Sequence, residues 1–131
     1  MPAIASLRRA ALPAVLGLIS LAVPVAAADL IMFEDPGCAW CVRWHAEVGD
    51  AYHLTAEGRR APLMRRDISD GAPEGVTLRM RPSFTPTFVL VEQGAEVGRI
   101  EGYPGEDFFW PMLNALLDRL PDTAAARSAG G

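Results

Sequence analysis

The chain passes from an apolar run into a cysteine pair within the stretch Leu30-Ile31-Met32-Phe33-Glu34-Asp35-Pro36-Gly37-Cys38-Ala39-Trp40-Cys41. The apolar run has the length of a buried strand, and the residues from Cys38 to about Tyr52 recur with helical spacing. Cys38 and Cys41 are the only cysteines in the chain. A Cys-x-x-Cys pair at such a junction is typical of a reversible dithiol/disulfide.

Residues 1–28 have the features of a secretory signal peptide. Arg8 and Arg9 precede an uncharged apolar stretch, Ala10 to Val25, and the small residues Ala26-Ala27-Ala28 follow it. A membrane anchor is the alternative, but a spanning helix needs about 20 apolar residues. We therefore expect cleavage near Ala28 and export to the periplasm, where disulfides persist.

The rest of the chain is long enough for one small domain. We place this domain at residues 29–121 and a flexible tail at 122–131. The full sequence has 12 basic and 16 acidic residues, and loss of Arg8 and Arg9 would make the mature chain more acidic still. This charge argues against nucleic acid or an anionic membrane surface as a partner.

Further strands and helices are predicted beyond the cysteine pair. Thr87–Val91 is the strongest strand signal, and Pro111 should kink or delay the last helix. The other predicted elements are a strand at 62–68, a short helix near 74–80, a turn at 94–96 leading into a strand at 97–103, and an amphipathic helix at 106–120. The inner side of that helix should carry Phe109, Met112, Leu113, Leu116, Leu117 and Leu120.

Three segments of the chain resemble the thioredoxin-like periplasmic thiol-disulfide oxidoreductases. They are Phe33 to Cys41, which resembles the redox motif, Phe84-Thr85-Pro86-Thr87-Phe88, which resembles the cis-proline loop, and the hairpin at Gly94 to Gly102. The resemblance implies an α/β thioredoxin-like fold with a central mixed sheet of about four strands flanked by helices. Within the family, the chain is most similar to small exported thioredoxins that accompany bacterial sulfur-oxidation systems.

The position of each cysteine predicts its role. A helix that begins near Cys38 places its sulfur close to unpaired backbone N–H groups, which favours the thiolate and lowers the pKa below the free value of about 8.5. Cys38 is therefore the expected nucleophile. Cys41, one turn further on and shielded, is expected to resolve the mixed disulfide.

The resemblance also implies roles for residues around the pair. Pro86 would form a cis peptide bond that leaves the backbone of Thr85 free to bind an extended substrate. Trp40 could contact the partner or lie in the core. Thioredoxins usually bury a carboxylate at the position that Met32 holds here, so a nearby acid, Glu34 or Asp35, or a water would have to serve Cys41. A solvated acidic loop is the favoured alternative for both acids.

Other functions remain open on the sequence. Cys38, Cys41 and His45 have a spacing that could bind copper or zinc, although a fourth ligand is not evident. The pair could form a purely structural disulfide, but such a short loop stabilises a fold little. Three arginine pairs, at 59–60, 65–66 and at 79 and 81, could converge on an anion or lie apart in solvent.

We expect an exported thiol-disulfide oxidoreductase that acts on partner proteins through Cys38 and Cys41 and needs no cofactor. A reductase is favoured over a dithiol oxidant, because the chain has no room for the inserted domain of larger oxidants. A periplasmic reductase requires a membrane thiol-disulfide transporter as its electron donor. Its substrate would be a cysteine-containing periplasmic protein, and we expect it to act as a monomer.

Overall fold

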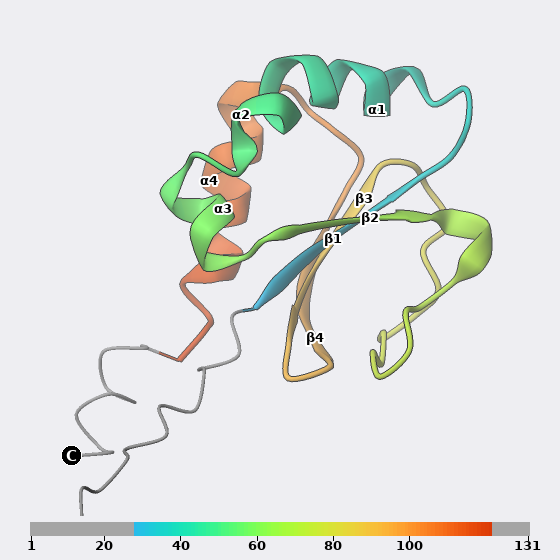
Figure 1. The fold of residues 1–131 in the computed structure, drawn as a ribbon, viewed down its shortest axis with the longest axis vertical. Helices are drawn as coiled ribbons and strands as arrows, with labels where there is room; N and C mark the ends of the chain where they lie inside the picture. The colour runs from blue at the N-terminus through green and yellow to red at the C-terminus, as the bar shows by residue number, and fades with distance from the viewer. Residues whose placement is uncertain (1–27, 122–131) are drawn as a thin grey trace, which may run out of the picture.

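The computed structural model describes residues 28–121, so the predicted signal peptide and tail lie outside the described residues. Four strands form one mixed sheet in the order β2-β1-β3-β4 (Figure 1). β1 (Asp29–Glu34) pairs in parallel with β2 (Leu63–Asp67) and antiparallel with β3 (Thr87–Glu92), which pairs antiparallel with β4 (Ala95–Glu101). The predicted mixed four-stranded sheet is confirmed.

The two faces of the sheet are covered in different ways. Leu30 and Met32 point to one face, where they pack with buried residues of the cysteine-bearing helix and of the last helix. Ile31 and Phe33 point to the other face, which is covered by Ile68, Val76 and Leu78 of the connector between β2 and β3. The α- and π-helices accordingly lie on one side of the sheet, and the connector, which begins with the 3-10 helix η2 (Ile68–Asp70), lies on the other (Figure 1).

The helix that carries the cysteines runs to Tyr52, as predicted, but it is not uniform. It consists of α1 (Ala39–Trp44), a π-helical segment, η1 (His45–Gly49), and α2 (Asp50–Tyr52). The N–H of Asp50 donates to the carbonyl of His45, five residues earlier, which widens the helix there. Gly49 therefore does not end the helix, and single π-turns of this kind occur often at functional sites.

Several predicted details are wrong. No helix forms near 74–80, because Pro73 begins a turn that contains Gly75 at positive φ, and Thr77 instead forms an isolated bridge with Ala95. The turn before β4 lies at Gln93 and Gly94, both with positive φ, so Ala95 is already in the strand. A short helix not foreseen, α3 (Ala56–Arg60), precedes β2.

The last helix, α4 (Glu106–Leu117), begins where predicted although Pro111 lies inside it. Phe109 and Leu113 are fully buried, whereas Met112 is exposed, contrary to the prediction. Phe109 contacts the rings of Phe88 and Trp44, so α4 and the cysteine-bearing helix share one aromatic core over the sheet.

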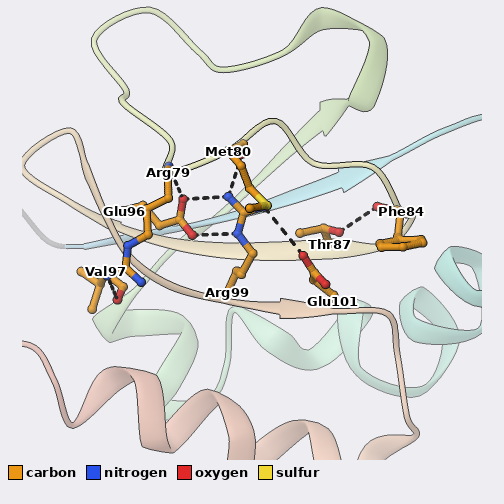
Figure 2. Close-up of polar contacts among 8 residues, drawn as sticks. All are labelled: Arg79, Met80, Phe84, Thr87, Glu96, Val97, Arg99 and Glu101. Carbon is orange, nitrogen blue, oxygen red and sulfur yellow. Dashed lines mark hydrogen bonds and ion pairs between the residues drawn. The ribbon is translucent and has the colours of Figure 1, made fainter.

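A cluster of polar contacts fixes the connector to β4 (Figure 2). The nearly buried Glu96 carboxylate accepts hydrogen bonds from Arg99, at 2.7 and 2.8 Å, and from the backbone N–H of Arg79 at 2.8 Å. Arg99 also donates to the carbonyl of Met80 at 2.8 Å. We call these four residues the Glu96 clamp. Because the connector leads into Thr85 and Pro86, the clamp anchors the chain just before that loop.

Candidate active site

Cys38 and Cys41 form a disulfide at the start of α1. Cys38 is the N-cap of the helix, and its Sγ accepts a hydrogen bond from the N–H of Cys41 at 3.1 Å. The same N–H would stabilise a thiolate on Cys38 after reduction. Cys38 is 9% exposed and Cys41 4%, so Cys38 is the more accessible of the two. This geometry fits the expected roles of Cys38 as nucleophile and Cys41 as resolving residue.

The Thr85–Pro86 peptide bond is cis, as the resemblance implied. Pro86 is buried, and the Thr85 hydroxyl donates to the Asp35 carboxylate at 3.2 Å, which links the loop to the turn before Cys38. Within residues 28–121 the backbone N–H and carbonyl of Thr85 have no hydrogen-bond partner. They are therefore free to pair with an extended segment of a substrate.

The C-terminal side of the Thr85–Pro86 loop is held where β3 begins. The hydroxyl of Thr87, which is buried, donates to the carbonyl of Phe84 at 2.7 Å (Figure 2). The N–H of Gly102 donates to the carbonyl of Pro86 at 2.7 Å. With the Glu96 clamp upstream, the loop is held on both sides, while the Phe84 side chain is 59% exposed.

Trp40 lies on the surface and not in the core, with 53% of its area exposed. The guanidinium of Arg43 lies over its ring, 5.5 Å from the centroid, and forms an ion pair with Glu47 at 2.7 Å. Tyr103 donates to the other oxygen of Glu47 at 2.6 Å. Hydrogen bonds from Tyr103 and Arg43 lower the pKa of Glu47. Trp40 is thus available to a partner on the rim of the site.

A cavity of about 500 Å³ opens beside the cysteines. Glu34, at the end of β1, is the centre of its charged wall: its Oε1 accepts from Arg65 Nε at 3.0 Å and its Oε2 lies 2.7 Å from His45 Nε2. Burial raises the pKa of Glu34, but the hydrogen bonds from Arg65 and His45 outweigh it and hold the pKa below its usual value. Cys38 and Cys41 line the same cavity.

Met32 is fully buried in β1, so no acid occupies the position where thioredoxins usually have one. Of the two nearby acids named from the sequence, Glu34 faces the cavity with His45, and Asp35 binds Thr85. The sequence pointed to Glu34 and to His45 separately. It gave no signal that the two side chains meet, because they come from different elements.

The other groupings suggested by the sequence do not form. His45 is engaged with Glu34, and residues 28–121 contain no group of three His, Cys, Asp or Glu side chains placed to hold a metal ion. The arginine pairs do not converge on one site: Arg60 donates to Leu117 and Arg81 to Ser69, each through a backbone carbonyl. No helix in the described part is long and apolar enough to cross a membrane.

The family model of a thioredoxin-like domain matches residues 28–117, which include the cysteine pair, the cis-proline loop and the whole sheet. The chain belongs to the thioredoxin-like family. It is also similar to the crystal structure of the periplasmic thioredoxin SoxS from Paracoccus pantotrophus in its reduced form. The identity is 53%, the TM-score is 0.69, and the match covers 70% of this chain and 97% of that chain. No curated protein matches the chain.

Family and geometry together define the chemistry. The protein is a thiol-disulfide oxidoreductase whose redox centre is the Cys38–Cys41 pair. A partner disulfide is exchanged in two steps, through a mixed disulfide on one cysteine that the other cysteine then resolves. Partner proteins with thiols or disulfides are accordingly its substrates.

Proposed function

We propose that the protein is an exported reductase of disulfides in a cysteine-containing periplasmic protein. Cys38 is its nucleophile, Cys41 its resolving residue, and Trp40, Thr85 and Pro86 bind the substrate. The observation that carries this proposal is the Cys38–Cys41 pair, placed at a helix start and linked through Asp35 to the cis-Pro86 loop. Identity of 53% to a protein described as a periplasmic thioredoxin supports both the location and the reaction.

The electrons must come from outside the protein, because each turnover leaves the Cys38–Cys41 disulfide behind. We assign their supply to a membrane thiol-disulfide transporter, since the periplasm is kept oxidising. The likeness to small thioredoxins that accompany sulfur-oxidation systems suggests a cysteine-bearing component of such a system as the partner. The signal peptide at 1–28 with cleavage near Ala28, the domain at 29–121 and a monomeric state belong to the same proposal.

The test is the reduction potential of the Cys38–Cys41 pair, measured by equilibration with dithiothreitol buffers. A value near or below about −200 mV, as in thioredoxin and glutaredoxins, is expected for a reductase. A value near about −120 mV, as in a strong periplasmic oxidant, would contradict the proposal and make the protein a disulfide donor.

The substrate can be captured by the same chemistry. Cys41→Ser leaves Cys38 able to attack but removes the resolving thiol, so a covalent complex with the partner should accumulate in periplasmic extract. Cys38→Ser is the matched control and should trap nothing through the nucleophilic position. Equal trapping by both variants would contradict the assignment of roles.

A further inference from the structure

The resolving step needs a group that takes the proton of Cys41. Burial disfavours the charged form of a thiol, and Cys41 is almost completely buried. In this chain Met32 occupies the position where thioredoxins usually bury a carboxylate, and its thioether cannot accept the proton. The side chains that could accept it are those that line the same cavity as Cys41.

The cavity contains five charged side chains besides His45, and most are engaged with other groups. Asp35 binds Thr85, and Asp67 accepts the N–H and hydroxyl of Ser69, which lower its pKa. Arg66 donates to backbone carbonyls of the turn after β2. Two candidates for the proton acceptor remain: His45, and Glu34, which is paired with Arg65.

His45 lines the same cavity as Cys41. It follows Cys41 by four residues, and side chains at that spacing lie on the same helix face with their Cβ atoms about 5–6 Å apart. Its Nε2 is fixed by Glu34 at 2.7 Å. Its Nδ1 packs against Gly49, where an added Cβ would lie 2.9 Å away. The ring thus occupies a defined position at the start of the π-helical segment.

We propose that Glu34 and His45 act as a pair that accepts the proton of Cys41 across the shared cavity. The Cys41 thiolate then attacks Cys38 Sγ in the mixed disulfide. The Cys38–Cys41 bond forms, the bond between Cys38 and the partner sulfur breaks, and the partner leaves as a thiolate with the electron pair. Arg65 balances the charge of Glu34 and holds one of its oxygens, which leaves the other for His45.

This inference rests on the proposed roles of Cys38 and Cys41, but not on the direction of electron flow in the cell. The experiment therefore uses the reduced protein and an uncharged small probe, bis(2-hydroxyethyl) disulfide, in excess. Acid quenching and mass analysis separate the mixed disulfide from the internal disulfide. The second, concentration-independent step reports the attack by Cys41.

The variants are His45→Gln and Glu34→Gln, with His53→Gln as the matched control. His53 is the only other histidine and is exposed just after α2. The wild-type step should slow as the pH falls, because a pair that is already protonated cannot accept the proton of Cys41. His45→Gln should slow it about ten-fold or more at pH 7, in line with the gain expected from a positioned base. Glu34→Gln should also slow it, and His53→Gln should not.

At high pH, where Cys41 ionises without help, His45→Gln should approach the wild-type rate. Structural damage would instead lower the rate at every pH, so this convergence separates the two explanations. A His45→Gln profile that coincides with the wild type would overturn the proposal, as would a uniform loss at all pH values. A reduction potential typical of an oxidant would contradict the proposed reductase and leave this result unchanged.

Discussion

Two clusters of this small domain each contain a glutamate paired with an arginine, but they differ in how far the two side chains are buried. In the Glu96 clamp, the carboxylate is only 2% exposed, and every contact it makes fixes backbone or Arg99. In the cluster of Glu34, Arg65 and His45, Arg65 is largely exposed and the carboxylate faces a cavity that reaches the disulfide. Burial and neighbouring groups therefore decide whether a glutamate–arginine pair only fixes the structure or also remains accessible for proton transfer.

The largest effect on stability is expected from Glu96→Gln. Arg99 would keep its charge in a nearly buried place with only the exposed Glu101, 3.9 Å away, as an ionised partner, which costs about 3 kcal/mol in the free energy of unfolding. Urea unfolding measures the loss. Glu101→Gln is the matched control: Glu101 lies 3.9 Å from the same arginine but is exposed, so its loss should stay below about 1 kcal/mol. Equal losses would mean that burial does not distinguish these pairs.

The contribution of the clamp should also depend on pH. Hydrogen bonds from Arg99 outweigh burial and lower the pKa of Glu96 from its usual 4.5. A carboxyl with a depressed pKa stabilises the fold fully above its unfolded pKa, and this contribution is lost as the pH falls through the folded value. The stability difference between wild type and Glu96→Gln should be constant above about pH 5.5 and shrink below pH 4.5. Other acids titrate in both proteins, so a difference that is unchanged at pH 3 would contradict the assignment.

The sequence predicted the parts of the fold that depend on local pattern. The strand at 87–91 was found because it is a run of β-branched and aromatic residues, and the cysteine-bearing helix because its apolar residues recur every three or four positions. The helix near 74–80 was wrong because Thr77 pairs with β4, a contact that no local pattern reveals.

The candidate site was likewise predicted only as far as local pattern and resemblance reach. Cys38 and Cys41 were recognised by their spacing, and the cis bond at Pro86 was inferred by resemblance and is present. The meeting of Glu34 with Arg65 depends on the parallel pairing of β1 with β2, and its meeting with His45 depends on how the turn after β1 places the cysteine-bearing helix. Such juxtapositions come from tertiary packing, which a single sequence does not display.

A smaller loss of stability is expected at the other cluster. Glu34→Gln removes a partly exposed carboxylate, and the exposed Arg65 can be solvated instead. The free energy of unfolding should fall by about 1 kcal/mol, which corresponds to about 4–8 °C in Tm for a domain of this size. Thermal unfolding followed by circular dichroism measures it. A loss as large as that of Glu96→Gln would show that this cluster also holds the structure, and would weaken its separate role.

The smallest change in stability should come from Trp40→Ala, because the indole is half exposed and its main neighbour is the exposed Arg43. Unfolding should change by less than about 0.5 kcal/mol. If Trp40 binds the partner, the rate of reduction of a protein disulfide, such as that of insulin, should fall several-fold. Reduction of bis(2-hydroxyethyl) disulfide should not fall, since that probe is too small to reach the rim.

Leu54→Ala is the control for this last comparison, because Leu54 is also exposed but follows the far end of the cysteine-bearing helix. It should leave both rates unchanged. An equal fall with both disulfides in Trp40→Ala would place the effect of the indole on the cysteines themselves. Trp40 would then influence the redox chemistry, as we propose for the Glu34 cluster. Partner recognition would depend on the loop of Thr85 and Pro86.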